Sequence, residues 1–278
     1  MRRRHPMYPV FAASLFSLFS LFFSAAPADA VDGVIEINQA SALAGGITPS
    51  DTPGFPVTLD HPGAYRLTGN LTVPANTTAV RIEAENVRLD LGGFEVRGPN
   101  LCSGYPTNDC TTIGGAPGIL SPTANQGLGV VRNGTVTGMG GPCIDLVGNS
   151  STVEQVAVYH CGGTSGTIGS GIRLGLFGRA IGNHVSNTFG DGISLLSGGE
   201  ARDNEARGNA FSGIISNGPR SALITGNMVY DNNSAGIVGG PLGGTLGLIS
   251  RNVMSGNLGG PFVRAVSAGD NLCSGTLC

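Results

Sequence analysis

The strongest constraint on this 278-residue chain is a motif that occurs four times between Phe177 and Arg264. An asparagine opens each copy, a second asparagine follows, and a Gly-Ile pair or its equivalent comes next. The opening asparagines are Asn183, Asn204, Asn227 and Asn252, at intervals of 21, 23 and 25 residues. A period in the low twenties is typical of a solenoid, in which no repeat can bury its apolar face alone. Because the apolar runs are short and rich in β-forming residues, the sequence predicts coils of β-strands.

Each recurring residue type has a physical role in such a coil. Asparagine tolerates the left-handed conformation of a sharp turn, and its side-chain amide can bond to that of the next coil, roughly 4.8 Å away. We therefore expect two asparagine ladders, the second made of Asn187, Asn209, Asn232 and Asn257. The residue after each glycine is expected to point into the core. That inward ladder consists of residues 119, 144, 172, 193, 214 and 237, all isoleucine, with Phe262 last.

This pattern resembles the right-handed parallel β-helix superfamily, which includes pectate lyases and many bacterial secreted proteins. The resemblance covers residues 63–264 and implies an all-β fold, a single-stranded right-handed parallel β-helix of about eight coils. Residues 31–62 lie outside the repeat and are expected to form an N-terminal cap, with a short helix from Ile37 to Ala44 capped by Asn38. Residues 265–278 are expected to form a C-terminal tail closed by a disulfide.

The first 30 residues have the features of a secretory signal peptide. A basic start precedes an apolar run from Phe11 to Ala26, and Ala28-Asp-Ala30 supplies small residues before the cleavage point. The mature chain would keep 12 arginines, no lysine and 17 acids, a formal net charge of −5. This balance argues against nucleic acid or anionic membranes as partners. We expect a secreted, periplasmic or cell-surface protein with no membrane span after cleavage.

Two insertions interrupt the repeat, over residues 99–117 and 161–170. Each insertion ends just before a Gly-Ile pair, so both should leave the solenoid at the same corner, two coils apart. Long loops on one side of a repeat array commonly form its binding face. The alternative is that the surface merely tolerates insertions at this corner.

Six cysteines remain in the mature chain, an even number that favours disulfides in an exported protein. Six cysteines allow fifteen pairings, and the coil register favours one of them. Two pairs are local in sequence, whereas Cys143 lies at the corner from which the Cys161 loop leaves one coil later. The expected bonds are Cys102–Cys110, Cys143–Cys161 and Cys273–Cys278. A metal site is the weaker alternative, because no Cys-x-x-Cys pair occurs.

Candidate ligand-binding residues gather at the looped corner. Outward positions after the inward isoleucines place Asp145 beside Arg173 on adjacent coils, and Asp191 lies on the next coil. With Tyr105 of the first insertion, these residues could hold a sugar. The alternative interpretation of Asp145 and Arg173 is a surface ion pair without a ligand.

Catalytic patterns of the related enzymes are missing from the sequence. The resemblance to polygalacturonases would require Asn-Thr-Asp, Asp-Asp, Gly-His-Gly and Arg-x-Lys, whereas this chain has Asn187-Thr-Phe and no lysine. The acid cluster of calcium-dependent pectate lyases is also missing, and we expect no metal or cofactor.

The leading hypothesis is a secreted, non-catalytic protein that binds extracellular polysaccharide at the corner formed by loops 99–117 and 161–170. One alternative is a polysaccharide lyase or glycoside hydrolase with an unrecognised site. Another is a structural or adhesive rod. Neither the ligand nor the oligomeric state follows from the sequence.

Overall fold

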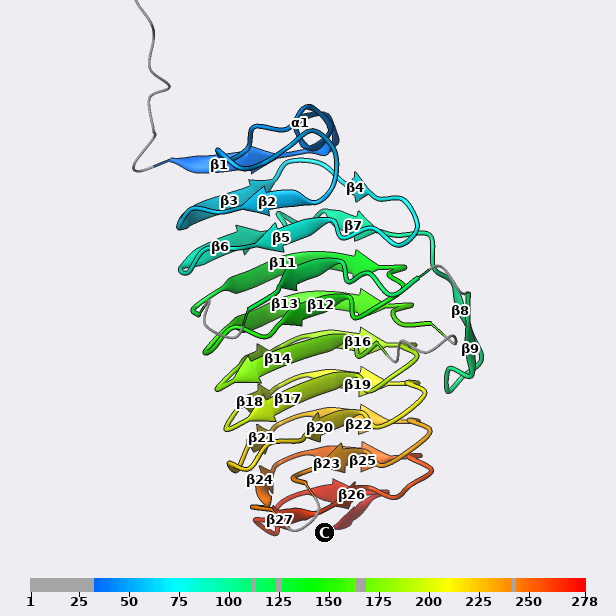
Figure 1. Ribbon diagram of the computed structural model, residues 1–278. Coiled ribbons are helices and arrows are strands. Elements are labelled where there is room, and N and C mark those ends of the chain that lie inside the picture. Colours follow the sequence, from blue (N-terminus) through cyan, green and yellow to red (C-terminus); the bar gives the residue numbers. More distant parts are fainter. Residues whose placement is uncertain (1–32, 112–113, 124–126, 164–168, 242–243) are drawn as a thin grey trace, which may run out of the picture. The chain divides into compact units, whose positions relative to one another are not determined.

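The computed structural model describes residues 33–111, 114–123, 127–163, 169–241 and 244–278. The expected signal peptide, residues 1–30, lies outside the described residues. Val34–Cys278 forms one compact unit, in which short strands follow one another around stacked coils (Figure 1). The predicted fold is confirmed: the unit is a right-handed parallel β-helix of about eight coils.

One side of the coil stack is a nine-stranded parallel sheet. Its strands are β2 (Val57–Leu59), β5 (Val80–Ile82), β10 (Ile119–Ser121), β12 (Ile144–Leu146), β14 (Ile172–Leu176), β17 (Ile193–Ser197), β20 (Ile214–Ser216), β23 (Ile237–Val238) and β26 (Phe262–Val263). The predicted inward ladder is confirmed, because each isoleucine from Ile119 to Ile237 pairs in register with the next and Phe262 ends the column. Val57 and Val80 extend this column toward the N-terminus.

The other side of the stack is an 18-stranded sheet, which we divide into two strips. The first strip contains β1 (Val34–Ile37), β3 (Gly63–Leu67), β6 (Val87–Asp90), β15 (Arg179–Ile181), β18 (Glu200–Arg202), β21 (Leu223–Thr225), β24 (Gly247–Ser250) and β27 (Ala265–Ser267). The second strip contains β4 (Leu71–Thr72), β7 (Glu95–Arg97), β16 (His184–Ser186), β19 (Glu205–Arg207), β22 (Met228–Tyr230), β25 (Val253–Ser255), β28 (Leu272–Cys273) and β29 (Thr276–Leu277). The long strands β11 (Val130–Thr137) and β13 (Thr152–Tyr159) contribute to both strips.

The first asparagine ladder runs along the turn between the two strips. Each side-chain amide nitrogen donates to the amide oxygen of the next asparagine at 2.9–3.0 Å. The four predicted members are confirmed, and Asn271 is a fifth. The asparagines are not the left-handed residues of this turn, contrary to our expectation. The residue before each of the four predicted members has a positive φ, as at Asp203 (φ 56°) and Gly226 (φ 69°).

The second ladder differs from the prediction by one residue in its first coil. Asn209, Asn232 and Asn257 form the expected column, but Asn187 occupies the left-handed position (φ 52°). Thr188 takes the ladder position instead and donates from its hydroxyl to Asn209 Oδ1 at 3.0 Å. A threonine hydroxyl can replace the amide there because only one donor toward the next coil is needed.

The two ends of the unit contain short additional elements. Helix α1 (Gln39–Ala44) is the predicted N-terminal helix, and the Asn38 side chain accepts from the Ser41 backbone N–H as its cap. Strand β1 before it pairs with β3. At the other end, β27 and β28 continue the coil pairing past Arg264, and β29 folds back antiparallel on β28.

All three predicted disulfides are present: Cys102–Cys110, Cys143–Cys161 and Cys273–Cys278. No cysteine of the chain is free. The coil register predicted the second bond correctly because Cys143 and Cys161 lie at one corner on neighbouring coils.

Candidate functional site

Both insertions leave the solenoid at the same corner, between the second strip and the nine-stranded sheet, as predicted. Residues 112–113 and 164–168 of these loops lie outside the described residues. The first loop contains the antiparallel strands β8 (Cys102–Ser103) and β9 (Asp109–Cys110), which the Cys102–Cys110 disulfide joins. Asn100, which is buried, ties this loop to the corner by donating to the Gly162 carbonyl at 2.5 Å. The two insertions are therefore held to each other.

Asp145 and Arg173 are cross-strand neighbours on β12 and β14, as predicted. Arg173 Nε and Nη2 donate to the two carboxylate oxygens of Asp145 at 2.7 and 2.5 Å. These hydrogen bonds raise the pKa of the Arg173 guanidinium. The Asp145 side chain is only 6% exposed, whereas that of Arg173 is 51% exposed. Of the two side chains, only the Arg173 guanidinium is therefore accessible to a ligand. The ion pair is half-buried and is not a fully hydrated surface pair.

Asp191 does not join that pair. Its carboxylate accepts from the Ser212 backbone N–H at 2.9 Å, on the following coil. Burial raises the pKa of this carboxyl, and the Ser212 bond only partly offsets that effect. Within the described part of the chain, no hydrogen bond or ion pair connects Asp191 with Asp145 or Arg173.

Tyr105 lies away from the Asp145–Arg173 pair, because its loop runs alongside the coils toward the C-terminus (Figure 1). The loop is bonded there by the Thr107 backbone N–H, which donates to the Gly208 carbonyl at 2.9 Å. The Tyr105 hydroxyl donates to Asp231 Oδ2 at 3.3 Å. Gly208 has a positive φ of 63°, and a Cβ on it would lie 2.5 Å from the Tyr105 ring. A glycine is thus needed where the loop packs, and the four candidate residues do not form one site.

Tyr105 instead meets a charged cluster on the second strip whose centre is Glu205. Its carboxylate accepts from His184 Nδ1 at 2.7 Å and from the Tyr230 hydroxyl, and Arg207 Nε lies 3.0 Å away. The hydrogen bond between Arg207 and Tyr105 raises the pKa of the Arg207 guanidinium. Three successive coils and the first loop therefore contribute side chains to one network around this carboxylate.

The protonation of this cluster follows from its contacts. Burial alone would raise the pKa of Glu205, but the bonds from Tyr230 and His184 and the charge of Arg207 lower it overall. Burial and the bond to Glu205 raise the pKa of Tyr230 to about 12. At neutral pH the cluster therefore has an ionised glutamate and a protonated tyrosine. A hollow of about 310 Å³ beside it is lined by His184, Glu205 and Asp203, among others.

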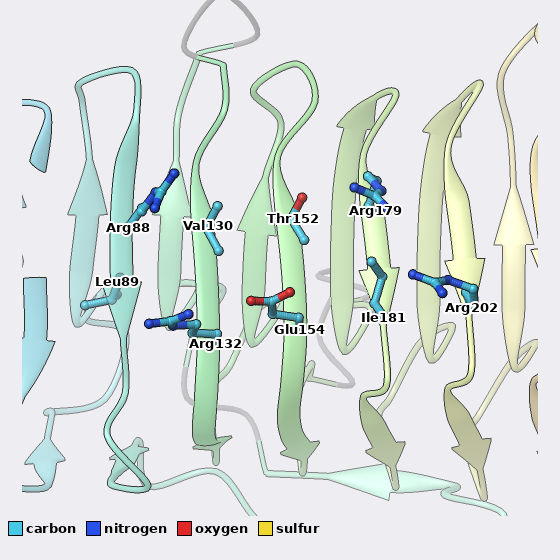
Figure 2. A pocket seen from close by; sticks show the side chains of 9 residues that line it. All are labelled: Arg88, Leu89, Val130, Arg132, Thr152, Glu154, Arg179, Ile181 and Arg202. Atoms are coloured by element: carbon cyan, nitrogen blue, oxygen red, sulfur yellow. The ribbon is translucent and has the colours of Figure 1, made fainter. Parts of the chain in front are cut away.

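A second group of charged side chains, mostly basic, lies on the first strip. An open hollow of about 420 Å³ crosses β6, β11, β13, β15 and β18 (Figure 2). Its charged lining residues are Arg88, Arg132, Arg179, Arg202 and Glu154. We call this hollow the arginine groove.

Strand register explains the shape of the arginine groove. Arg88, Val130, Thr152 and Arg179 occupy one outward column on four successive coils. The short side chains of Val130 and Thr152 leave a depression between the two longer arginines (Figure 2). At roughly 4.8 Å per coil, Arg88 and Arg179 are attached about 14 Å apart.

The groove arginines differ in how strongly they are already paired. Arg132 lies 3.2 Å from Asp90, and Arg179 donates to Glu200 at 2.8 Å. Glu200 also lies 3.2 Å from Arg202. Arg88 is exposed and makes no side-chain hydrogen bond or ion pair with any described residue. Arg88 is therefore the cation most available to a ligand.

The arginine groove was not among the features predicted from the sequence. The repeat pattern alone did not place Arg88 beside Arg179. The missing information was the alignment of residues 87–90 with residues 179–181 across two intervening coils. A constant repeat length does not give this alignment, because the insertion after residue 98 lies between the two segments.

Two further observations concern cofactors and membranes. No group of three or more histidine, cysteine or acidic side chains is placed to hold a metal ion in the described ranges. None of the helices in the part of the chain that the structure covers is both long and apolar enough to cross a bilayer.

Comparisons with known proteins concern the fold alone. No family model matches the sequence, and no curated protein matches it. Among solved structures, the chain is similar to the Dettilon tailspike protein, with 18% identity and a TM-score of 0.42 over 73% of this chain and 40% of that chain. It is also similar to XylC in its complex with xylose, with 12% identity and a TM-score of 0.37 over 72% of this chain and 37% of that one. The class of protein, a parallel β-helix, is defined by the chain's own strand pairing.

Proposed function

We propose that this is a secreted, non-catalytic β-helix protein that binds an acidic extracellular polysaccharide in the arginine groove. The observation that carries the proposal is the set of four arginines around one open hollow on five neighbouring coils. Three disulfides in the chain are consistent with an oxidising, extracellular location.

The chemistry of the groove favours sugar carboxylates. Guanidinium groups present planar, paired donors that match a carboxylate, and each such charge-assisted hydrogen bond is stronger than a neutral one. The spacing between coils is close to the length of one sugar in an extended chain, so a polysaccharide along the solenoid axis would meet a new coil at each residue. The groove is preformed on a rigid sheet, which lowers the ordering cost of binding.

The looped corner remains a second candidate location for the same function. Arg173 exposes half of its side chain there, on the strand that follows loop 161–170, and Cys161 of that loop is bonded to Cys143. Asp145 contributes by holding Arg173 in place. A ligand at this corner would contact one arginine, whereas the groove offers four.

Catalysis is a second candidate function, and one observation favours it. His184 Nδ1 donates to the ionised Glu205, so a neutral imidazole there would have Nε2 as its acceptor. A histidine oriented by a carboxylate is a common arrangement for a general base. The hollow of about 310 Å³ beside it could admit one sugar of a lyase or hydrolase substrate.

Binding measurements with matched variants test the proposal. Arg88→Gln/Arg179→Gln should weaken binding of a polyuronate at least tenfold, since losing two charge-assisted hydrogen bonds costs about 1.4 kcal/mol or more. Arg251→Gln is the control, because Arg251 is an exposed arginine on the turn after β24, outside the groove. A neutral glucan should bind no more weakly to the double variant than to the native protein.

Four outcomes would change this assignment. Equal losses of affinity in the double variant and the control would exclude the groove as the binding site. A larger loss of affinity in Arg173→Gln would place the site at the looped corner. Release of new sugar ends that stops in His184→Ala would establish catalysis. A chain that binds no polysaccharide at all would leave only a structural role.

A further inference from the structure

Each coil of the arginine groove contributes one charged side chain to the lining of the hollow. Strand register places these coils in the order β6, β11, β13, β15 and β18. In that order the charged residues are Arg88, Arg132, Glu154, Arg179 and Arg202. The groove is therefore basic toward both ends and acidic on its central coil (Figure 2).

Glu154 differs from the other acids beside the groove because its carboxylate has no partner. Asp90 lies 3.2 Å from Arg132, and Glu200 accepts from Arg179 at 2.8 Å. Glu154 makes no side-chain hydrogen bond or ion pair with any described residue. The other two acids are thus already bonded to arginines, whereas the oxygens of Glu154 are free to accept hydrogen bonds from a ligand.

The neighbours of Glu154 on the adjacent coils explain why its carboxylate is unpaired. Arg132 is its cross-strand neighbour on β11, but the guanidinium extends away from β13 and pairs with Asp90 on the preceding coil (Figure 2). On the following coil the neighbour is Ile181, which is apolar. The central coil therefore presents a hydrogen-bond acceptor to the hollow, with cations on the coils before and after it.

We propose that Glu154 makes the groove selective for acidic polysaccharides in which uncharged sugars are interspersed with charged ones. This inference rests on the proposed binding of an acidic polysaccharide in the groove. With one sugar opposite each coil, a chain that has a carboxylate on every sugar brings one of them against Glu154, and like charges in contact disfavour binding. An uncharged sugar at that coil instead donates from its hydroxyls to the Glu154 carboxylate, and such charge-assisted bonds are stronger than neutral ones. The four arginines remain for the charged sugars on either side.

Two polymers with the same backbone test this assignment. Polyglucuronate has a carboxylate on every sugar, and partial reduction of its carboxyl groups to alcohols gives a chain with uncharged glucose units interspersed. Glu154→Gln should raise the affinity for polyglucuronate roughly fivefold, because it removes one like-charge contact of the strength expected in water. The same variant should lower the affinity for the reduced polymer roughly threefold, since an amide oxygen is a weaker acceptor than a carboxylate.

Glu36→Gln is the matched control, because it changes the net charge of the protein by the same amount. Glu36 is exposed on β1 and lies in the same outward column as Glu154, four coils before it. That separation is roughly 19 Å, at which exposed charges are screened at physiological ionic strength. Both affinities of the control should therefore stay close to those of the native protein. Thermal midpoints close to the native one will show that both variants are folded.

The outcomes separate this inference from the proposed function. A change by the same factor for both polymers in Glu154→Gln, or equal effects of Glu154→Gln and Glu36→Gln, would overturn the selectivity and leave the groove as the binding site. Native protein that binds neither polymer would overturn the proposed function and the selectivity with it. So would Arg88→Gln/Arg179→Gln if it bound polyglucuronate as tightly as the native protein does.

Discussion

Replacement of Asn227 by alanine measures how much the first asparagine ladder stabilises the coil stack. Asn227 is fully buried in the middle of that ladder. Its amide nitrogen donates to the Ala201 carbonyl and to Asn252 Oδ1, both at 2.9 Å. Its amide oxygen accepts from the backbone and side-chain nitrogens of Asn204 at 2.9 and 3.0 Å. Alanine would remove all of these contacts.

The cost follows from which neighbours lose a partner. The Asn204 backbone N–H loses its acceptor, and the Ala201 carbonyl loses its amide donor. The other partners keep one bond each, because Asn204 Nδ2 still donates to Ala180 and Asn252 Oδ1 still accepts from the backbone at position 227. A buried polar group without its partner costs about 1–3 kcal/mol, so Asn227→Ala should cost about 2–6 kcal/mol. Water entering the vacated space would give the lower end.

Urea unfolding with the disulfides intact provides the assay. The free energy of unfolding should fall enough to lower the midpoint by roughly 1 M or more. Asn233→Ala is the control, because Asn233 is exposed in the same coil and should change stability by less than about 0.5 kcal/mol. Equal midpoints for the two variants would refute the view that the ladder stabilises the stack.

Three further predictions concern stability. Ile193→Asp places a carboxylate in the fully buried ladder and should cost several kcal/mol, whereas a native-like urea midpoint would mean that residue 193 faces water. Arg173→Ala should lower the free energy of unfolding by about 1–3 kcal/mol, a value between those of a buried and a surface ion pair. Adding Asp145→Asn should restore most of that stability, and no recovery would contradict the pairing. The pKa of Asp191 is raised in the folded state by burial. Its contribution to the free energy of unfolding is therefore favourable below the unfolded pKa and is lost as pH rises through the folded pKa. Asp191→Asn should therefore raise the thermal midpoint more at pH 7 than at pH 4, and an equal effect at both would exclude this titration.

The sequence predicted the features that depend on the repeat alone. The inward isoleucines, the Cys143–Cys161 bond and the contact between Asp145 and Arg173 all follow from aligning one coil with the next. Stacked parallel coils leave little freedom in that alignment, because a slip of one residue would turn the apolar set outward.

Features that depend on side-chain chemistry or on loop paths were not predictable in the same way. The repeat period predicts that the first coil has a residue in the second ladder. It does not decide whether that residue is Asn187 or Thr188, since both side chains can donate a hydrogen bond. The contact of Tyr105 with Arg207 joins residues 102 apart in sequence, and the loop that makes it has no repeat to align. The burial of Asp145 likewise depends on its three-dimensional surroundings at the corner and not on its strand.

Hydrogen-exchange mass spectrometry with and without a polyuronate would test the proposed function most directly. If the ligand binds in the arginine groove, protection should concentrate in the peptides that contain residues 87–90, 130–132, 152–154 and 179–181, and it should disappear in Arg88→Gln/Arg179→Gln. Protection confined to residues 169–175 at the looped corner, or to residues 182–186 beside His184, would contradict it.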